Sequence, residues 1–419
     1  MSAPSPLPIP LLVSITATWF VSQLSYYAQP QLLSPIMSHF SRGEESVGLI
    51  YGVEVAAFAF TALLAAGPLG RVSRVGLSLF GGAILVAANV LSGFIASGSG
   101  GAILVAANAL SGLISFEFSD GFELLQFSRV MAGVGGGLLG AAGTAAAASA
   151  RDPQRVFAIV TFTSFMLIAA ESPLLPLVLT PFGAKGGFFA LAGATAIMMP
   201  LFVWLLPPRR EEGDEKSSIW AGLLSAPNRS FALFAMLALF IYEAGQGAVF
   251  MFIAEIGERS QLGEQAVGNA LGATALAGLA GAVFAAWLGG RFGSKWPIVI
   301  GIGGNVLAAA GLALVASAFP YVLMNLIWSL AYYFVVPYLM GVIAEMDDRG
   351  RWVVAVDAIW WLGDAAAPAV GGMIVARSGY DLLALFPVVT GVVCIAVFMK
   401  LLVRFSEHRD RLAAEAAVG

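Results

Sequence analysis

The sequence predicts an all-α membrane protein with twelve transmembrane helices, arranged as two pseudo-symmetric six-helix bundles around a central cavity. Three observations predict this class. The chain of 419 residues is 59% hydrophobic and 11% charged, whereas soluble domains carry about 25% charged residues. Apolar runs of about eighteen or more residues recur along it, each long enough to cross a hydrocarbon core about 30 Å thick. The two halves of the chain also resemble each other.

Twelve apolar runs supply the predicted helices. Those of the first half lie at 9–33, 46–68, 75–97, 121–149, 155–180 and 186–206. Those of the second half lie at 230–257, 264–289, 296–317, 319–345, 351–376 and 380–404. The runs are continuous and rich in Ala, Gly and Leu, whereas a transmembrane β-barrel would show alternating segments of about ten residues.

The order of these runs predicts the domain organisation. Residues 1–206 form an N-terminal bundle and residues 230–406 a C-terminal bundle. The polar stretch 207–229 between them is a cytoplasmic linker, and residues 407–419 are a cytoplasmic tail.

The positions of Lys and Arg predict the orientation, because short cytoplasmic loops are enriched in them. With both termini in the cytoplasm, only four of the 21 basic residues fall on the other side, namely Arg42, Lys185, Arg259 and Arg377. The N-terminus lacks Lys and Arg and a clear cleavage site, so we expect no removable signal peptide. We expect a multi-pass protein of the cell inner membrane.

A tandem duplication lies within residues 81–118. The stretch 81–93 recurs at 100–112 with an offset of 19 residues. A crossing by the second copy would move every later loop to the other side and reverse the charge asymmetry. We therefore expect residues 100–119 to add no net crossing and to form an extended third helix, a re-entrant piece or a periplasmic lid.

A second, longer repeat relates the two halves. A shift of 220 residues superposes four pairs without a gap: Gly48 and Gly268, Gly52 and Gly272, Gly70 and Gly290, and Arg71 and Arg291. Together with the six-plus-six count and the polar linker, this repeat predicts two parallel halves around a central path.

Several motifs resemble those of the major facilitator superfamily of secondary transporters. Leu288–Lys295 is similar to its G-x-L-a-D-R-x-G-R-R loop, of which Leu69–Arg74 is a degraded copy, although both put Gly where the family has Asp. Arg129–Gly135 resembles the fourth-helix R-x-x-x-G-x-G motif, and Gly363–Gly372 the eleventh-helix Gly/Pro pattern. The resemblance implies alternating access, with gating loops that contain Arg71, Arg74, Arg291 and Lys295.

When residues close to the ends of the predicted spans are set aside, five acids and one base lie inside the spans. They are Glu54, Glu171, Glu243, Asp357 and Asp364, with Arg129 as the base. Such residues cost about 2.5 to 3.5 kcal/mol at the centre of a membrane helix, so they normally face a cavity or a partner. A carboxylate that alternates between closed and open surroundings can take up and release a proton. The excess of acids therefore indicates proton coupling.

Two clusters are candidate substrate or proton sites. The residues Asp357, Trp360, Trp361 and Asp364 share one helix face. Acids beside indole rings suit a cationic or aromatic amphiphile, although a lipid-facing Trp and a hydrogen-bonded Asp364 would give the same pattern. The second cluster is Tyr242, Glu243 and Gln246. The aromatic residues of the span 319–345 are candidates to line the cavity, although interfacial anchoring also explains the last of them: Trp328, Tyr332, Tyr333 and Tyr338.

Arg129 has two interpretations. It pairs with Glu171, or it is a structural residue that donates to backbone carbonyls.

The leading hypothesis is a secondary active transporter that moves a small organic solute across the inner membrane by alternating access and is coupled to protons, with a lean towards export of cationic or amphipathic compounds. The alternatives are proton-coupled uptake of a small organic acid at Arg129 and a non-transporting membrane sensor or receptor. The sequence has no G-x-x-x-x-G-K-[ST] loop and no set of residues typical of an intramembrane enzyme.

We expect no cofactor and no metal, since the chain has one cysteine, Cys394, and two histidines, His39 and His408. The expected partners are a small-molecule substrate, protons and the lipid bilayer. No basic block suggests nucleic acid, and we expect a monomer.

Overall fold

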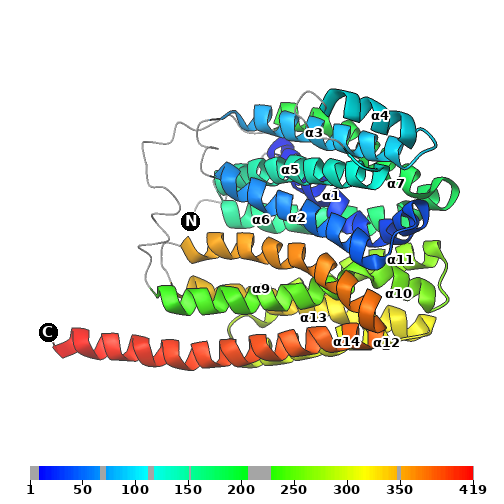
Figure 1. Cartoon of the computed structure of the whole chain (residues 1–419). Coiled ribbons are helices and arrows are strands. Elements are labelled where there is room, and N and C mark those ends of the chain that lie inside the picture. The colour runs from blue at the N-terminus through cyan, green and yellow to red at the C-terminus, as the bar shows by residue number, and fades with distance from the viewer. Residues whose placement is uncertain are drawn as a thin grey trace. The chain divides into compact units, whose positions relative to one another are not determined.

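The computed structural model of the chain describes residues 9–66, 72–111, 118–150, 152–205, 228–346 and 351–418. Within these ranges every regular element is a helix, as Figure 1 shows. In chain order they are α1 (Ile9–Phe40), α2 (Glu44–Ala66), α3 (Arg74–Ile95), α4 (Gly100–Ser111), α5 (Gly121–Ala148), α6 (Pro153–Leu174), α7 (Pro176–Leu205), α9 (Arg229–Met251), α10 (Ile253–Arg259), α11 (Glu264–Leu288), α12 (Lys295–Leu314), α13 (Ala318–Ala344) and α14 (Arg351–Val418). The all-α prediction is confirmed.

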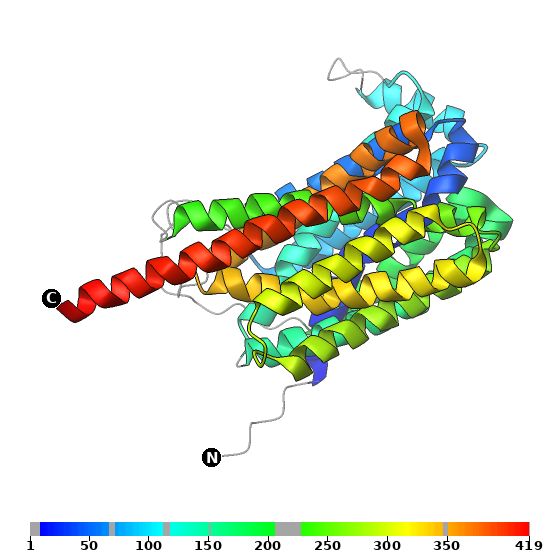
Figure 2. The same cartoon turned by 90° about the horizontal axis from the view of Figure 1, so that it is seen from below.

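Eleven of these helices are long and apolar enough to cross a membrane. The last, α14, supplies two crossings, because its backbone breaks at Gly379 with φ 72° and ψ −170°. Glycine has no Cβ and adopts this conformation readily. The two arms of α14, orange and red, run in opposite directions in Figures 1 and 2. The prediction of twelve transmembrane helices is therefore confirmed.

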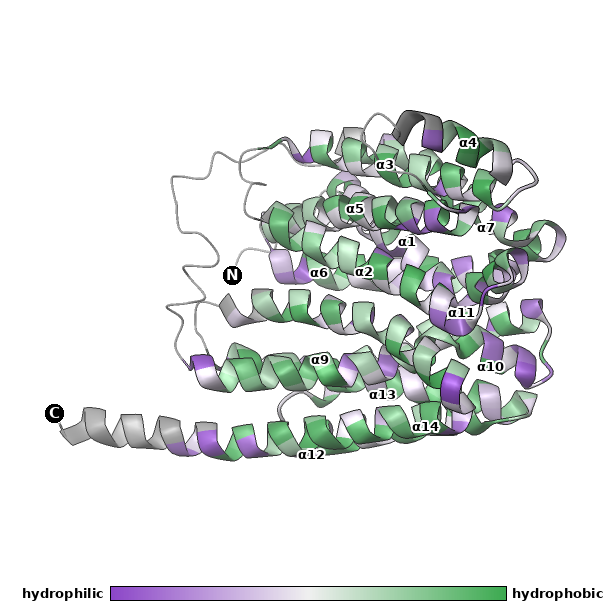
Figure 3. Cartoon of the chain, in the orientation of Figure 1, coloured by the Kyte–Doolittle hydropathy of each residue, from purple (hydrophilic) through white to green (hydrophobic). Residues whose placement is uncertain are grey.

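Polar residues gather at the helix ends, which Figure 3 shows as purple turns at the ends of mainly green helices. Asp120 begins α5 by accepting a hydrogen bond from the backbone N–H of Glu123 at 2.9 Å. Asp152 accepts from the N–H of Arg155 at 3.1 Å at the start of α6. Such caps pair backbone donors that the first helical turn leaves free.

The chain forms two compact units, which we describe separately. Unit 1 comprises Met1–Glu215 with Leu262–Ala275, and unit 2 comprises Lys216–Gln261 with Leu276–Gly419. The first half of α11 is thus grouped with unit 1, where the side-chain amide of Gln265 donates to the carbonyl of Pro173 at the end of α6.

In unit 1, α5 packs against α1, α2 and α3. Its contact with α2 depends on Gly133 and Gly137. A Cβ on Gly133 would lie 2.1 Å from the carbonyl oxygen of Glu54, and one on Gly137 would lie 2.6 Å from that of Phe58. Only glycine permits this approach, as expected where membrane helices associate through small residues.

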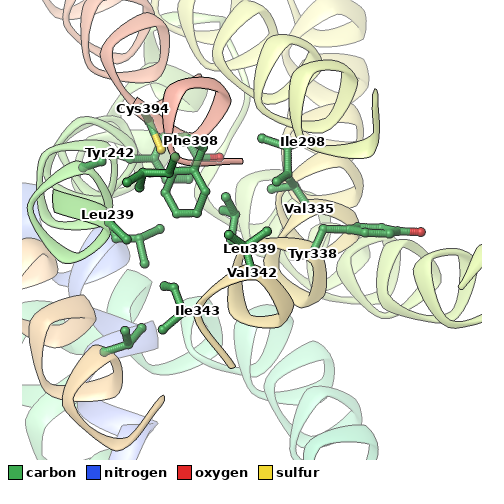
Figure 4. Packing of buried hydrophobic residues seen from close by; sticks show 14 of the residues in the cluster. Leu239, Tyr242, Ile298, Val335, Tyr338, Leu339, Val342, Ile343, Cys394 and Phe398 are labelled. Atoms are coloured by element: carbon green, nitrogen blue, oxygen red, sulfur yellow. The ribbon is translucent and has the colours of Figure 1, made fainter. Parts of the chain in front are cut away.

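In unit 2, an apolar core joins α9, α12, α13 and α14. Leu239, Ile298, Leu339 and Phe398 come from these four helices and converge in Figure 4. Cys394 is buried in the same core and forms no disulfide. This core holds α9 beside α13 and α14, and so fixes the positions of the polar residues on α9.

The duplicated segment forms a separate short helix. The chain turns after Ile95, where the N–H of Gly100 donates to the carbonyl of Ser97 at 3.1 Å, so the prediction of an extended third helix is wrong. The second copy forms α4, which contacts α3 and α5. Its twelve residues fall short of the roughly 20 that a crossing needs. Residues 112–117 of the duplication lie outside the described residues.

The two polar segments differ in what the structure describes. Of the predicted linker 207–229, only residues 228–229 are described. The predicted tail continues α14 as a helix to Val418. Its Ala, Glu, Arg and Leu residues are strong helix formers.

Candidate functional site

Each unit contains a cluster of buried polar side chains. The unit 1 polar centre consists of Ser25, Gln29, Glu54, Asn89, Ser92 and Arg129, which come from α1, α2, α3 and α5. Arg129 is 0% and Glu54 4% exposed. An ion pair so deep in the protein is stable only when hydrogen bonds satisfy both partners.

Arg129 is held by oxygen atoms of neighbouring side chains. Its Nη2 donates to Asn89 Oδ1 at 3.0 Å and to Ser92 Oγ at 2.7 Å. Its Nη1 lies 3.6 Å from Glu54 Oε1, and its Cζ lies 4.8 Å from the ring centroid of Phe188 on α7. Its Nη1 also lies 3.5 Å from Ser25 Oγ on α1, so the guanidinium links five helices of unit 1.

Glu54 is equally well engaged. Ser25 Oγ donates to its Oε1 at 2.6 Å, and Gln29 Nε2 approaches its Oε2 at 3.4 Å. Among the described residues neither of the two interpretations of Arg129 is observed, because it does not pair with Glu171 and does not donate to a backbone carbonyl. The reason is position: Glu54 and Arg129 lie on helices that pack directly through Gly133, whose Cβ would touch the carbonyl of Glu54.

Glu171 lies on α6 away from this centre. Both of its carboxylate oxygens are shielded from solvent and have no hydrogen-bond partner among the described residues. The neighbouring Ser172 carbonyl accepts from Gln31 Nε2 at 3.2 Å. Glu171 is therefore a half-buried residue of unit 1 with shielded carboxylate oxygens and no direct link to Arg129.

The unit 2 polar centre is built from α9, α13 and α14. It consists of Glu243, Gln246, Trp328, Tyr332, Trp360 and Asp364. Glu243 is 1% and Gln246 2% exposed. The hydroxyl of Tyr332 donates to Glu243 Oε2 at 2.7 Å and accepts from Trp360 Nε1 at 3.0 Å.

The second hydrogen bond from α13 holds Gln246. Trp328 Nε1 donates to Gln246 Oε1 at 2.8 Å. Trp328 and Tyr332 are four residues apart on α13, and their partners are three residues apart on α9, so one face of each helix meets the other. Each bond uses only one polar atom of its α9 partner.

Asp364 lies beside Glu243 at the contact between α9 and α14. A Cβ on Gly247 would lie 2.9 Å from Asp364 Oδ1, and one on Gly363 would lie 2.7 Å from Glu243 Cβ. The two acids interact electrostatically. This contact places two like charges together, the reverse of the pairing in unit 1.

Four aromatic rings form a ladder along this centre. The rings of Phe250 and Trp328 are 6.1 Å apart at 12°, those of Trp328 and Tyr332 6.1 Å apart at 22°, and those of Tyr242 and Tyr332 6.4 Å apart at 20°. Trp360 meets Tyr332 edge-on at 5.9 Å. Near-parallel rings beside carboxylates are a suitable wall for a planar cation.

The structure separates some predicted neighbours. The Tyr242 hydroxyl donates to Asn305 Oδ1 on α12 at 2.7 Å. Trp360 and Asp364 both reach the unit 2 polar centre, and Trp361 beside them on α14 is partly exposed. The side chain of Asp357 lies outside the described residues.

The predicted gating residues occupy helix ends. Arg74 Nη2 donates to Ser149 Oγ at 2.6 Å, which ties α3 to the end of α5. Arg291 lies 5.4 Å from the ring centroid of Trp287, and Lys295 lies 5.9 Å from that of Trp296. Arg71 lies outside the described residues.

Sequence reasoning missed the partners that complete both centres. Four residues were not candidates: Ser25, Gln29, Phe188 and Asn305. The three polar ones are nevertheless visible in the sequence as polar residues inside apolar runs. Ser25 and Gln29 are four residues apart in the first apolar run, and Asn305 is a lone amide inside another. Polar residues without charge carry a weak penalty in a membrane helix, so such positions were not singled out.

Comparisons with known proteins agree with this architecture. The family model described as Major Facilitator Superfamily matches residues 15–346 and again 235–417. No curated protein matches the sequence.

The chain is similar in structure to a mutant of the nucleoside transporter NupG, with 15% identity, a TM-score of 0.68, and 94% of this chain and 100% of that chain covered. It is similar to a mutant of the peptide transporter POT in complex with sulfate (14% identity, TM-score 0.66, coverage 93% and 94%). It is also similar to a bacterial homolog of the human lysosomal transporter Spinster in an inward-facing and occupied conformation (14%, TM-score 0.67, 93% and 96%). Identities this low indicate a shared fold alone.

Proposed function

Because the chain belongs to the Major Facilitator Superfamily and is therefore a secondary transporter rather than an enzyme, we propose that it exchanges protons for cationic or amphipathic organic compounds. Export is the proposed direction. We place the exchange at the unit 2 polar centre, where the substrate and protons bind in turn.

The observation that carries this proposal is the environment of Glu243. It is buried, it has Asp364 as a neighbouring acid, and its described hydrogen bond comes from the neutral Tyr332 hydroxyl. Within the described ranges no basic side chain forms an ion pair with it. A buried carboxylate in such surroundings needs a proton or an incoming cation to balance its charge.

The alternative substrate class, an organic acid bound by Arg129, receives less support. Both Nη atoms of Arg129 already face oxygen atoms of Glu54, Asn89, Ser92 and Ser25. An anionic substrate would have to displace Glu54 from its cation. We propose that Glu54 and Arg129 hold the helices of unit 1 in their positions. We also propose that Glu171 is a second proton-binding group.

The orientation proposed for the protein places both termini in the cytoplasm of a cell with an inner membrane. The support is the excess of Lys and Arg in the loops on that side. In this arrangement Arg71, Arg74, Arg291 and Lys295 form the cytoplasmic gating loops. This orientation can be tested with cysteines introduced at Ser294 and at Gly263. Their accessibility to membrane-impermeant reagents shows on which side of the membrane each position lies.

Proteoliposomes separate these functions by the polarity of the gradient. A proton antiporter accumulates 1-methylquinolinium when the interior is acidic, whereas a proton symporter accumulates 2-naphthoate when the interior is alkaline. The quinolinium ion is permanently charged, so it is not trapped as a weak base, and the membrane potential is held at zero. Vesicles without protein are the control.

Accumulation of the cation against its gradient supports the proposal. Accumulation of the anion alone favours the organic-acid alternative. Binding of either compound without flux in both gradients would identify a sensor and contradict transport.

A further inference from the structure

Two buried polar atoms of the unit 2 polar centre have no hydrogen-bond partner in the part of the chain that the structure describes. They are Oε1 of Glu243 and Nε2 of Gln246. Both side chains are more than nine-tenths buried. Since buried polar groups in proteins nearly always have partners, a pair of exceptions at one site calls for an explanation.

The two atoms are complementary in hydrogen bonding. When Glu243 is deprotonated its free oxygen is an acceptor that carries negative charge, and the Gln246 nitrogen is a donor. The orientation of the Gln246 amide is fixed by Trp328, whose indole N–H can only donate and therefore selects Oε1 as its acceptor. Glu243 is fixed in the same way, because the Tyr332 hydroxyl that donates to Oε2 accepts from Trp360.

The acceptor and the donor also lie close together. Glu243 and Gln246 are three residues apart on α9, and side chains with this spacing lie on one helix face with Cβ atoms about 5 to 6 Å apart. A ligand that satisfies both must offer a donor and an acceptor side by side. A carboxamide has this edge, and so does any ring with an N–H next to a carbonyl.

The ring ladder adds a second requirement. Phe250, Tyr332 and Trp360 remain partly exposed although Trp328 is buried, so part of the ring surface of this centre is open to a flat ligand. The acids Glu243 and Asp364 favour positive charge at this position.

We propose that the unit 2 polar centre recognises a planar cation that carries a carboxamide-like edge, with its N–H donating to Glu243 Oε1 and its carbonyl accepting from Gln246 Nε2. This inference rests on the proposed function and specifies its substrate class. In this arrangement the two α9 atoms bind the ligand directly. Tyr332 and Trp328 do not bind it through these bonds but hold the two α9 side chains in position.

Four small pyridine derivatives separate the edge from the charge. 1-Methylnicotinamide has both, 1-methylpyridinium has the charge alone, nicotinamide has the edge alone, and nicotinate is the anion. Calorimetric titration of the purified full chain is expected to give at least tenfold tighter binding of 1-methylnicotinamide than of 1-methylpyridinium or nicotinamide, with nicotinate the weakest.

Two nearly isosteric substitutions exchange only the unpartnered atoms. Glu243→Gln can keep the bond from Tyr332 while turning the acceptor into a donor, and Gln246→Glu can keep the bond from Trp328 while turning the donor into an acceptor. Each is expected to bring the affinity ratio of 1-methylnicotinamide to 1-methylpyridinium to within about threefold of unity. The double variant restores one donor and one acceptor in reverse order, so the ratio is expected to return.

A ratio that the single swaps do not change would overturn the inference and indicate that the two atoms hold only an ordered water. A lost ratio that the double variant does not restore would contradict it too. If Gln246→Glu does not fold, Gln246→Met, which also removes the donor, replaces it. Failure of the proposed function is distinct: the expected ratios without any flux would refute transport and leave the binding site intact.

Discussion

The two units solve the same problem, a carboxylate inside a membrane protein, in opposite ways. In unit 1, Glu54 lies 3.6 Å from Arg129, and hydrogen bonds from neighbouring side chains complete the arrangement. In unit 2, Glu243 faces Asp364 and keeps one oxygen without a partner among the described residues. The first centre supplies its own cation, although Arg129 Nε has no hydrogen-bond partner among the described residues, whereas the acids of the second centre have no ion pair with a described basic residue.

The comparison indicates that the unit 1 polar centre contributes to the stability of the fold, whereas the unit 2 polar centre is available for binding. A satisfied buried ion pair resists removal of either partner, because the remaining charge is left buried alone. An unsatisfied site has a free-energy cost that a ligand can remove, so that binding is favoured there. The predictions below test this contrast.

The largest expected effect is on unit 1. Arg129→Met leaves Glu54 buried without its cation, and we expect a loss of about 3 to 5 kcal/mol in the free energy of unfolding. Denaturant unfolding in detergent, followed by tryptophan fluorescence, measures it. The double variant Glu54→Gln/Arg129→Met leaves no charge at these two positions and is expected to recover a large part of the lost free energy of unfolding. A single variant as stable as the original would show that the centre is not structural.

The next effect is on transport by unit 2. Glu243→Gln removes the charge that needs a proton or a cation, so we expect proton-driven accumulation of 1-methylquinolinium to fall at least tenfold. Its stability is expected to stay within about 1 kcal/mol, because no ion pair is broken. Flux and unfolding measured on the same preparation check both parts. Undiminished accumulation would remove Glu243 from the coupling.

A smaller effect is expected at the hydroxyl that positions Glu243. Tyr332→Phe keeps the ring ladder but removes a hydrogen bond to a charged group, which is worth about 1.5 to 3 kcal/mol. We expect affinity for 1-methylnicotinamide to fall by roughly tenfold or more, with less change in stability. Tyr333→Phe, on the neighbouring residue, is the matched control.

The smallest effects come from the duplicated segment, in which the same residues occupy two environments. Asn89 lies buried in α3 and accepts from Arg129, whereas Asn108 in α4 exchanges two hydrogen bonds with the backbone of Phe118. We expect Asn89→Ala to cost about 1 to 2 kcal/mol and Asn108→Ala less than about 1 kcal/mol. Equal costs would contradict the assignment of Asn89 to the unit 1 polar centre.

Helix positions were well predicted because each depends on a local property. The apolar run 264–289 corresponds to α11 at Glu264–Leu288, and the run 121–149 to α5 at Gly121–Ala148. A helix needs about 20 apolar residues to cross the bilayer, and these residues are consecutive in the sequence. The short helix α4 was harder, because nothing within the repeated sequence says which copy packs in the bundle.

The site was predicted residue by residue but not contact by contact. Glu54 and Arg129 were both candidates, yet Glu171 was the only acid considered as a partner of the arginine, beside the alternative of a structural arginine. Distance along each helix gives depth in the membrane, whereas the choice between Glu54 and Glu171 depends on which helices touch. Small residues such as Gly133 decide that, through contacts that no single helix contains.

By itself the sequence determined the helical class, the number of crossings and which ionisable side chains lie in the apolar segments, because transfer of each segment into lipid is a sum over its own residues. Only the tertiary structure decided that Arg129 neutralises Glu54, and that Glu243 lies beside Asp364 and accepts a hydrogen bond from Tyr332. Charge pairing depends on separation in space, and the packing of helices distant in the chain sets those separations.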